Sequence, residues 1–261
     1  MSDTTLPRTP DLSRFSLEGR TALITGASRN IGAALAIGFA LAGADLLLVA
    51  RDSARLTTHA DEVRERTGRM VRTISVDITA AGAAHAIAGA VDALPNGLDI
   101  LVNNAFTGGS LQAPIVDTPD SVWQEVLETN LMAPVRLCRQ FAPVLACSGS
   151  GVIINVVSGS GLLPNPDVGA YGVSKAALWM LTRYLAVELA PTIRVNALCP
   201  GLTSPDGEAI DHPVYRHLLP LIPLGRLARA EEMVGAAIFL ASAASSYATG
   251  ELLIVNGGRP W

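Results

Sequence analysis

The sequence is poor in cysteine, and its thiols do not suit a disulfide scaffold. Cys138, Cys147 and Cys199 form no CxxC pair, and an odd number of thiols cannot all pair with one another. Free thiols are typical of the reducing interior of the cell. We therefore expect a cytoplasmic protein in which Cys199 either lines a site or packs as a small buried side chain.

Long apolar and dense basic segments are also missing. No uninterrupted apolar stretch reaches the roughly 20 residues that span a bilayer. Residues 1–15 are polar and contain proline, so they lack the apolar centre of a signal peptide. With a formal net charge of −4 and no basic run, the chain does not carry the electrostatic footprint of a nucleic-acid binder. The sequence predicts a soluble protein that binds neither membrane nor nucleic acid.

Metal and hydrolase signatures are weak or absent. None of the four histidines pairs with another histidine and a carboxylate at a spacing that suits a metal ion. The segment Gly159-Ser160-Gly161 is not the GxSxG turn of a serine hydrolase. We expect no metal site.

Hydrophobic residues are abundant, at 49% of the chain, and they fall into an alternating pattern. Short continuous apolar runs predict strands that are buried on both faces, and Ala-rich helical segments separate them. The expected strands are Thr21–Thr25, Leu46–Ala50, Met70–Val76, Leu98–Asn103, Val152–Val157, Ile193–Leu198 and Leu252–Val255. The expected helices are Ile31–Ala42, Ser53–Thr67, Ala80–Ala93, Val122–Ala146, Tyr171–Ala190 and Ala230–Ala241.

This alternation predicts an α/β fold. We expect a Rossmann-like, doubly wound parallel sheet of about seven strands with helices on both faces. Residues 1–18 are predicted to form an N-terminal arm and residues 19–261 a single domain. The proline-rich stretch Pro205–Pro223 interrupts the rhythm, and we expect either a lid or binding loop or a packed surface segment.

A glycine-containing turn follows the first strand directly and leads into a helix. Backbone N–H groups at a helix start offer positive partial charge to a pyrophosphate, and small residues let that group approach. The turn predicts that the domain binds a dinucleotide; a simple tight turn is the alternative. The residues expected to contact the cofactor here are Gly26, Ser28, Arg29, Asn30, Ile31 and Gly32.

Two arginines favour NADP(H) over NAD(H). An acidic residue at the end of the second strand would bind the ribose 2′-hydroxyl of NAD, but Ala50 occupies that place and Arg51 follows it. Arg29 lies inside the glycine turn, and a guanidinium suits the 2′-phosphate of NADP. Two solvated surface arginines are the alternative, and Asp52 lies close enough to weaken the preference.

A tyrosine and a lysine share one face at the start of a later helix. Tyr171 and Lys175 are one helical turn apart in Tyr171-Gly172-Val173-Ser174-Lys175. A free tyrosine is a poor base at neutral pH, and a nearby ammonium lowers its pKa by favouring the phenolate. The pair therefore suits proton transfer to and from a carbonyl or alcohol oxygen, although an exposed helical pair would look the same.

Together these motifs resemble those of the short-chain dehydrogenase/reductase family, over roughly Leu17 to Gly258. The family's turn reads TGxxxGxG, and Asn30 replaces its middle glycine; Asn tolerates left-handed backbone. The segment Asn103-Asn104-Ala105 resembles the NNAG motif with Phe106 in place of glycine. Its ring either narrows the cofactor channel or packs beneath it.

The resemblance implies roles for four residues at the family's spacing. Tyr171 would be the general acid/base, and Ser158 would polarise and orient the substrate oxygen. Lys175 would hold the nicotinamide ribose and tune Tyr171, and Asn130 would anchor a water that relays protons to Lys175. As alternatives, Ser158 could cap a loop, Ser160 could take its place, and Asn130 could stabilise a mid-helix bend.

The resemblance also implies further cofactor contacts, in addition to Tyr171 and Lys175. They are Arg51, Asp77, Ile78, Asn103, Ala105, Pro200, Gly201 and Thr203, with Ser204 as an alternative to Thr203. Asp77 could instead cap a helix. Asn103 could hold two strands together, and this role is compatible with cofactor contact.

The expected function is an NADP(H)-dependent oxidoreductase that interconverts a carbonyl and a secondary alcohol on a small, mainly apolar substrate. The alternatives are a dinucleotide-binding sensor without redox turnover and a lyase or isomerase of the same fold. The helices that contain Val135 and Leu178 resemble those through which family members associate. A homodimer or homotetramer is therefore expected.

Overall fold

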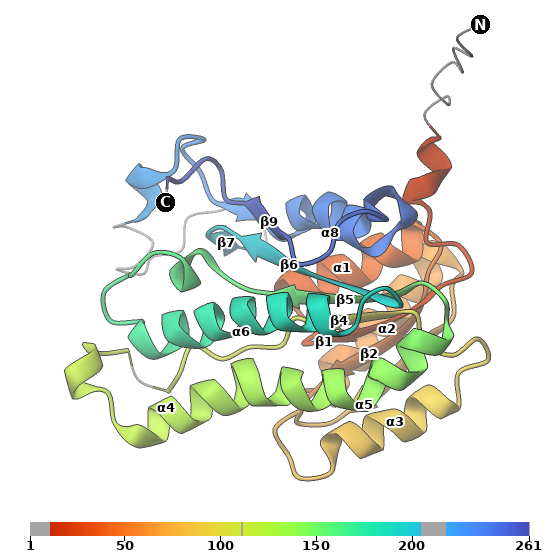
Figure 1. The fold of residues 1–261 in the computed structure, drawn as a ribbon, viewed down its shortest axis with the longest axis horizontal. Coiled ribbons are helices and arrows are strands. Elements are labelled where there is room, and N and C mark those ends of the chain that lie inside the picture. Colours follow the sequence, from red (N-terminus) through yellow and green to blue (C-terminus); the bar gives the residue numbers. More distant parts are fainter. Residues whose placement is uncertain (1–10, 111, 205–217, 261) are drawn as a thin grey trace, which may run out of the picture.

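The computed structural model describes residues 11–110, 112–204 and 218–260 (Figure 1). Seven strands form one parallel sheet in the order β3-β2-β1-β4-β5-β6-β9, which confirms the predicted doubly wound fold. The strands are β1 Thr21–Thr25, β2 Asp45–Ala50, β3 Val71–Ser75, β4 Ile100–Asn103, β5 Gly151–Val156, β6 Ile193–Pro200 and β9 Leu252–Val255.

Continuous burial explains why the inner strands are uninterrupted apolar runs. Every residue of β1, β4 and β5 is buried, because helices cover both faces of the sheet. Strand β1 pairs with β2 on one side and with β4 on the other. The chain order reverses at this point, and doubly wound sheets generally bind ligands in the crevice outside the carboxyl ends of the strands at such a reversal, here β1 and β4.

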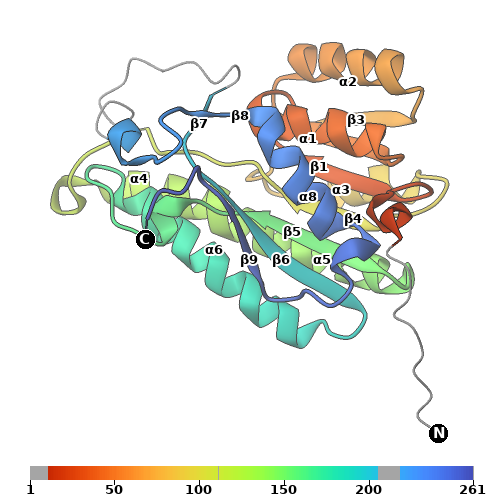
Figure 2. The same ribbon diagram turned by 90° about the horizontal axis from the view of Figure 1, so that it is seen from above.

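Two helical layers enclose the sheet (Figure 2). One layer consists of α1 Asn30–Leu41, α2 Ser53–Thr67 and α8 Val234–Ala241, and its core includes Leu35, Phe39 and Ala237. The other consists of α3 Ala83–Asp92, α5 Ala133–Cys147 and α6 Gly169–Glu188, with Ile87 and Phe141 in its core.

One expected helix is interrupted. The sequence predicts a single helix over Val122–Ala146, whereas the structure has α4 Asp120–Leu127, a π-helical turn η3 Glu128–Met132, and then α5. A π turn inserts one extra residue into the helical path and often marks a functional site. The insertion falls on Asn130, whose contacts are described below.

Part of the expected N-terminal arm lies against the helical layer. A short 3₁₀ helix, η1 Leu12–Phe15, begins the described chain. The Phe15 ring contacts that of Phe239 at 6.3 Å between centroids, and the Arg14 guanidinium donates to the Ala243 carbonyl at 2.7 Å. Leu17 is fully buried. A boundary at residue 18 stays a prediction.

The proline-rich excursion is only partly described. Residues 205–217, with His212 and His217, lie outside the described residues. On either side, β7 Thr203–Ser204 pairs in parallel with β8 Ala228–Arg229, and η5 Leu219–Leu221 forms a 3₁₀ turn. In the described parts of the chain, no helix has the length and apolar character needed to cross a membrane.

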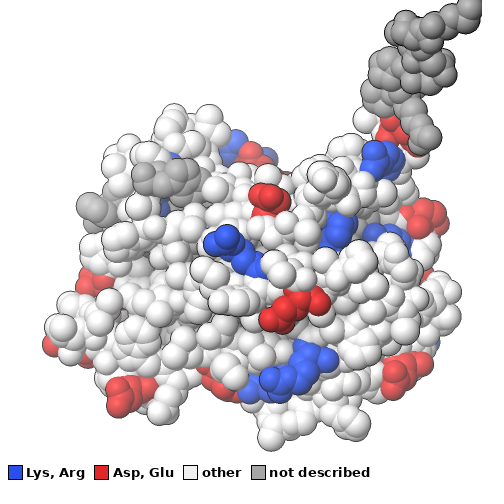
Figure 3. All heavy atoms as spheres, in the orientation of Figure 1, with Lys and Arg blue, Asp and Glu red and all other residues white. Residues whose placement is uncertain are grey.

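The face that carries α4, α5 and α6 is mostly uncharged, with scattered acidic and basic side chains (Figure 3). Along α6 itself, four large apolar side chains are exposed to solvent. They are Val173, Met180, Tyr184 and Val187. Their spacing places them on one side of the helix.

Candidate functional site

The glycine turn between β1 and α1 has the backbone geometry that the sequence predicts. Gly26 has φ +66°, and Asn30, at the first position of α1, has φ +49°. Asparagine is one of the few residues that adopt this left-handed conformation readily, so the departure from glycine leaves the turn intact. The N-cap residue Arg29 makes no side-chain capping bond to the helix. The start of α1 therefore fits an anionic group such as a pyrophosphate.

Close backbone contact explains the glycine at position 32. A Cβ there would lie 2.3 Å from the Gly26 carbonyl oxygen and 2.5 Å from Asn104 Nδ2. The helix can approach the turn this closely only because the side chain is missing. Any larger residue would push α1 away from the turn.

Asn104 fastens the turn to β4, a role that the sequence did not reveal. Its Nδ2 donates to the Thr25 carbonyl at 2.8 Å and lies 3.3 Å from that of Gly26. The Thr25 hydroxyl accepts from the backbone N–H groups of Asn104 and Ala105 at 3.0 and 3.1 Å. The crevice is therefore cross-linked at its base by buried hydrogen bonds. The only sequence signal for this role is that Asn104 lies inside the motif Asn103-Asn104-Ala105.

The residues after β2 that bear on cofactor choice lie at the carboxyl end of that strand. Strand β2 ends at the almost fully buried Ala50, and the Arg51 side chain is 75% exposed, with Asp77 Oδ2 3.7 Å from its Nη1. Asp52 is engaged elsewhere, because its Oδ1 accepts from the Arg55 backbone N–H at 3.0 Å and caps α2. The Asp52 carboxylate, whose closeness argued against a preference for NADP(H), therefore caps α2.

Asp77 and Asn103 have structural partners at the carboxyl ends of β3 and β4. Partial burial raises the pKa of Asp77, but hydrogen bonds from Thr79 and the charge of Arg51 outweigh it and hold that pKa below its usual value. Asn103 Nδ2 donates to Asn155 Oδ1 at 2.8 Å and thereby joins β4 to β5. Asn103 therefore has the strand-joining role considered above. Ile78 is also buried at this edge.

Two glycines bring the Ser158 segment against the start of α6. A Cβ on Gly161 would lie 2.7 Å from the Ala176 backbone nitrogen, and one on Gly172 would lie 2.7 Å from the Ser160 carbonyl oxygen. Ser158 precedes the short 3₁₀ turn η4 Gly159–Gly161, and its hydroxyl accepts from the Ser160 N–H at 3.2 Å. Ser158 therefore caps this turn, and the turn lies beside the helix that carries Tyr171.

Tyr171, Lys175 and Phe106 form a cluster near the carboxyl ends of β4 and β5. The Lys175 ammonium lies 5.8 Å from the centre of the Tyr171 ring and 5.5 Å from that of Phe106. It also donates to the Val156 carbonyl at 2.8 Å and is almost fully buried. Lys175 is the only lysine in the sequence. The structure thus brings the tyrosine and the lysine together as the spacing predicts.

Burial determines the charge of this lysine. It lowers the pKa of the Lys175 ammonium to about 7, although the Cys199 thiol acts in the opposite direction. The buried Cys199 has its own pKa raised to about 12 and stays a neutral thiol at physiological pH. Cys199 is thus buried next to the site. A lysine that exchanges its proton near neutrality is unusual and is typical of catalytic sites.

The pH dependence of stability tests the burial of this ammonium. Between about pH 7 and the ordinary lysine pKa of 10.5, the unfolded chain binds more protons at Lys175 than the folded chain does. We therefore expect the free energy of unfolding to rise across this window in the wild type and to rise less in Lys175→Met. Urea unfolding at several pH values measures the difference. Parallel pH curves for the two proteins would contradict the expectation.

Asn130 lies fully buried in the π turn and links three segments. Its Oδ1 accepts from the Thr107 N–H at 2.9 Å, and its Nδ2 donates to the Thr107 carbonyl at 2.9 Å and to Ser174 Oγ at 3.0 Å. Both amide protons are used in these bonds. The side chain therefore joins the segment after β4 to α6 and stabilises the interrupted helix, as one of the alternatives above anticipated.

Glu125 from α4 holds the same segment. It accepts from the Thr107 hydroxyl and from the Ser110 N–H, both at 3.0 Å. The hydrogen bond from Ser110 is the main reason that the pKa of Glu125 lies below its usual value. Neither Glu125 nor Thr107 has a sequence signal of its own, because their roles depend on the packing of α4.

The segment after β6 approaches the last strand closely. A Cβ on Gly201 would lie 2.6 Å from the Asn256 Cα, so glycine is required there. Pro200 is the last residue of β6, and the Thr203 hydroxyl donates to the Gly201 carbonyl at 3.1 Å. These residues lie at the carboxyl edge of the sheet, on the side of β5 away from β1.

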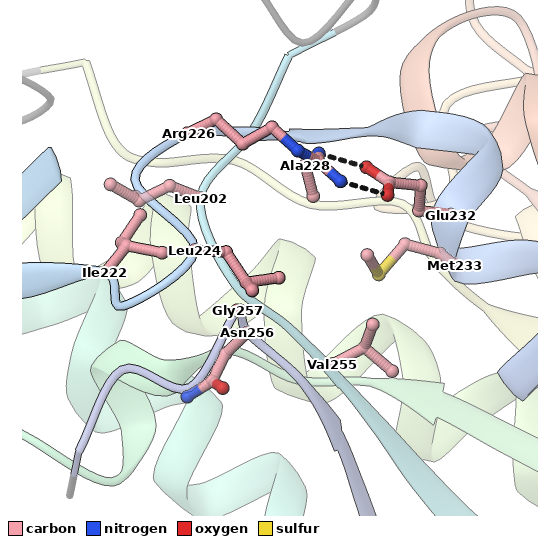
Figure 4. A pocket seen from close by; sticks show the side chains of 10 residues that line it. All are labelled: Leu202, Ile222, Leu224, Arg226, Ala228, Glu232, Met233, Val255, Asn256 and Gly257. Carbon is pink, nitrogen blue, oxygen red and sulfur yellow. Dashed lines mark hydrogen bonds and ion pairs between the residues drawn. The ribbon is translucent and has the colours of Figure 1, made fainter.

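Two hollows lie near these segments. A groove of about 750 Å³ runs along the start of α6 and is lined by mainly apolar residues, among them Ile115, Leu162, Leu163 and Val168. The second is a small pocket of about 60 Å³ beside Leu202 (Figure 4). There the Arg226 guanidinium forms two 2.7 Å bonds with Glu232, and Leu224 and Met233 contribute apolar walls. Within the described residues, no group of three potential ligands suits a metal ion.

Known proteins match the chain over almost its whole length. Residues 26–259 match the family model described as enoyl-(acyl carrier protein) reductase. A 3-oxoacyl-(acyl-carrier-protein) reductase of rhamnolipid biosynthesis from Pseudomonas aeruginosa is 36% identical over 265 residues, which cover 94% of this chain and 97% of that protein.

Several similar solved structures contain a nicotinamide cofactor, and two of them illustrate the range. L-sorbose reductase from Gluconobacter frateurii, in complex with NADPH and L-sorbose, has a TM-score of 0.86 at 35% identity and covers 94% of this chain and 98% of its own. A 7α-hydroxysteroid dehydrogenase complexed with NADH and 7-oxo glycochenodeoxycholic acid has a TM-score of 0.89 at 31% identity, with coverage of 96% and 98%. Because these relatives differ in substrate and in cofactor, the specificity of this chain has to come from its own residues.

Proposed function

We propose that this chain, which belongs to the short-chain dehydrogenase/reductase family, uses NADP(H) to interconvert a ketone and a secondary alcohol. It is an NAD(P)-dependent oxidoreductase that acts on CH–OH and C=O groups. The observation that carries the proposal is the cluster of Tyr171 and Lys175 at the crevice that the glycine turn opens. Oxidation or reduction of NADP(H) in the presence of a panel of ketones and alcohols, followed by absorbance, tests it. A cofactor that binds without turnover of any compound would overturn it.

The residues of the turn would hold the cofactor. The left-handed Gly26 and Asn30, the close approach at Gly32 and the start of α1 fit a pyrophosphate, and Ser28, Ile31 and Ala105 line the same turn. At the other end of the site, Pro200, Gly201 and Thr203 would lie beside the nicotinamide, as the family resemblance implies. When bound, the nicotinamide supplies or accepts the hydride.

Tyr171 would move the proton. In reduction its hydroxyl donates a proton to the substrate oxygen, and in oxidation its phenolate takes that proton back. The nearby Lys175 ammonium favours the phenolate, and the Ser158 hydroxyl would hydrogen-bond the substrate oxygen and orient it. Asn130 would keep the segment after β4 and the catalytic helix in register while anchoring the proton-relay water.

A double substitution tests the choice of cofactor. Arg29 and Arg51 are the exposed guanidiniums at the places where a 2′-phosphate would lie. In Arg29→Ala/Arg51→Ala we expect kcat/KM for NADPH to fall by about 10- to 100-fold per charge-assisted bond lost, with little change for NADH. Steady-state rates with both cofactors measure this.

The exposed Arg66, at the far end of α2, supplies the matched control. Arg66→Ala should leave the preference for NADPH over NADH unchanged. An equal loss with NADH and NADPH in the double variant would show that neither arginine reads the 2′-phosphate.

The substrate is proposed to be small and mainly apolar. Leu162, Leu163 and Pro164 follow Ser158 closely and line the groove along α6, together with Ile115 and Val168. Burial of apolar substrate surface against such residues would contribute most of the binding energy.

We also propose that the chain forms a homodimer or homotetramer through α5 and α6. The exposed apolar stripe Val173, Met180, Tyr184 and Val187 on α6 supports this proposal. Sedimentation at several protein concentrations would establish the oligomeric state.

A further inference from the structure

Phe106 is an unusual residue for its position. The NNAG pattern has glycine there, whereas this chain has a large aromatic side chain that is 56% exposed. An apolar ring of this size at the mouth of a polar crevice loses the stabilisation that burial would give it. Its position therefore calls for a contact that a glycine could not make.

The backbone on both sides of Phe106 is held by hydrogen bonds. The Ala105 N–H donates to the Thr25 hydroxyl at 3.1 Å, and Thr107 exchanges two bonds with the Asn130 amide, both at 2.9 Å. Glu125 holds the Thr107 hydroxyl as well. With its neighbours held in this way, the backbone of Phe106 is fixed relative to β1 and η3.

The Phe106 ring lies against Tyr171 and Lys175. The centres of the Phe106 and Tyr171 rings are 6.0 Å apart, with 56° between the ring planes. The Lys175 ammonium lies over both rings, at 5.5 and 5.8 Å from their centres. The three groups thus form a nearly equilateral triangle. A cation within about 6 Å of a ring centre is attracted by the negative face of the ring.

We propose that Phe106 is a positioning residue for the proposed proton-transfer machinery: its ring and that of Tyr171 both attract the Lys175 ammonium and hold it beside them. The ring stabilises the charged form of the lysine in a place where burial opposes it. It also fixes the ammonium beside the tyrosine before any ligand enters. This inference rests on the proposed roles of Tyr171 and Lys175.

The other titratable groups on the elements packed against α6 do not account for the charged form of Lys175. Cys199, on β6, acts to raise the pKa of Lys175, but burial outweighs it, and the thiol itself is neutral at physiological pH. Glu125, on α4, accepts hydrogen bonds from Thr107 and Ser110, and Glu128, on η3, pairs with Arg136. The remaining elements packed against the start of α6, η4 and β5, carry no titratable side chain.

The single lysine allows a direct test without substrate or cofactor. Protein labelled with ¹³C-lysine gives the signal of Lys175 alone, and its chemical shift against pH reports the pKa. In Phe106→Leu, which keeps an apolar side chain but loses the aromatic face, we expect the pKa of Lys175 to fall by about half to one unit. Phe106→Tyr keeps the aromatic face and should leave the pKa within a few tenths of the wild-type value.

A matched control comes from the other exposed aromatic pair. The Phe15 ring is also partly exposed and tilted against a second aromatic ring, at Phe239, but it lies on η1. Phe15→Leu should leave the titration of Lys175 unchanged. The thermal midpoint of each variant shows whether it is folded.

A second readout follows the catalytic consequence. A less stable ammonium favours the Tyr171 phenolate less, so the pH profile of alcohol oxidation in Phe106→Leu should move to higher pH, and that of Phe106→Tyr should not. If the wild type turns over no ketone or alcohol, the proposed function fails, but the lysine titration still decides the role of Phe106. Equal lysine pKa values in the wild type, Phe106→Leu and Phe106→Tyr would overturn the inference even in an active enzyme.

Discussion

Replacing Tyr171 by phenylalanine is expected to abolish turnover and leave cofactor binding nearly intact. The substitution removes only the phenolic hydroxyl, and the ring that packs against Phe106 and Lys175 remains. General acid–base catalysis contributes about 10²- to 10⁴-fold to rates, so we expect kcat to fall by about 10²- to 10⁴-fold. Steady-state assays measure the rate, and quenching of protein fluorescence by NADPH measures the binding.

The same helix offers a matched control. Tyr184 lies on α6 with its side chain 63% exposed, outside the cluster. Tyr184→Phe removes an identical hydroxyl and should retain wild-type kcat and KM. If Tyr171→Phe kept more than a tenth of the wild-type rate, another group would have to supply the proton, and the proposed role of Tyr171 would be wrong.

Removing the amide of Asn130 should reduce both stability and activity. Asn130→Ala leaves the Thr107 N–H and carbonyl without their partner and breaks the link to Ser174. Unsatisfied buried polar groups cost about 1–3 kcal/mol each, so we expect the free energy of unfolding to fall by about 2–4 kcal/mol. Because the Phe106 segment and α6, which carries the proposed catalytic Tyr171, then lose their common anchor, kcat should fall as well. Urea unfolding and assays well below the transition measure the two effects.

A second buried asparagine separates stability from catalysis. Asn196 is also fully buried, and its amide donates to the Ala248 carbonyl at 2.8 Å and accepts from the Glu251 N–H at 3.0 Å. Asn196→Ala should lose comparable stability, while the folded protein keeps its kcat. If both variants lost activity only in proportion to the unfolded fraction, Asn130 would have no part in positioning the site.

The fold could be predicted because its signals are local. Continuous apolar runs such as Leu46–Ala50 identify strands that are buried on both faces, and the glycine turn identifies where a helix must follow. Helix boundaries such as Ser53–Thr67 follow from a capping Asp52 and a left-handed Gly68. These features depend on a few consecutive residues, so a single sequence carries them.

The missed features depend on contacts between distant segments. The π turn at Glu128–Met132 has no periodic signal, because it accommodates bonds from Asn130 to residues on two other elements. The two-residue strands β7 and β8 are too short for any alternation to appear. Asn104 looked like part of a motif, and only the structure reveals that its amide fastens the glycine turn.

The sequence predicted that Tyr171 and Lys175 lie together, but it did not predict how other residues are arranged around them. The spacing of Tyr171 and Lys175 places them on one face of a helix, as the structure has them. It does not reveal that Phe106, from another strand end, lies against both. Lys175 is also the only lysine in the chain, and this fact can be read from the sequence alone.

The position of β9 has a consequence for how the protein is made. This last strand lies at the edge of the sheet beside β6, and its following turn contacts Gly201. A chain emerging from the ribosome can assemble β1, β2 and β3 early, because these neighbours are consecutive in the sequence. The close contact between Gly201 and Asn256 can form only after β9 has been synthesised. The strands beside the glycine turn can therefore pair before the segment after β6 gains its contact with the end of β9.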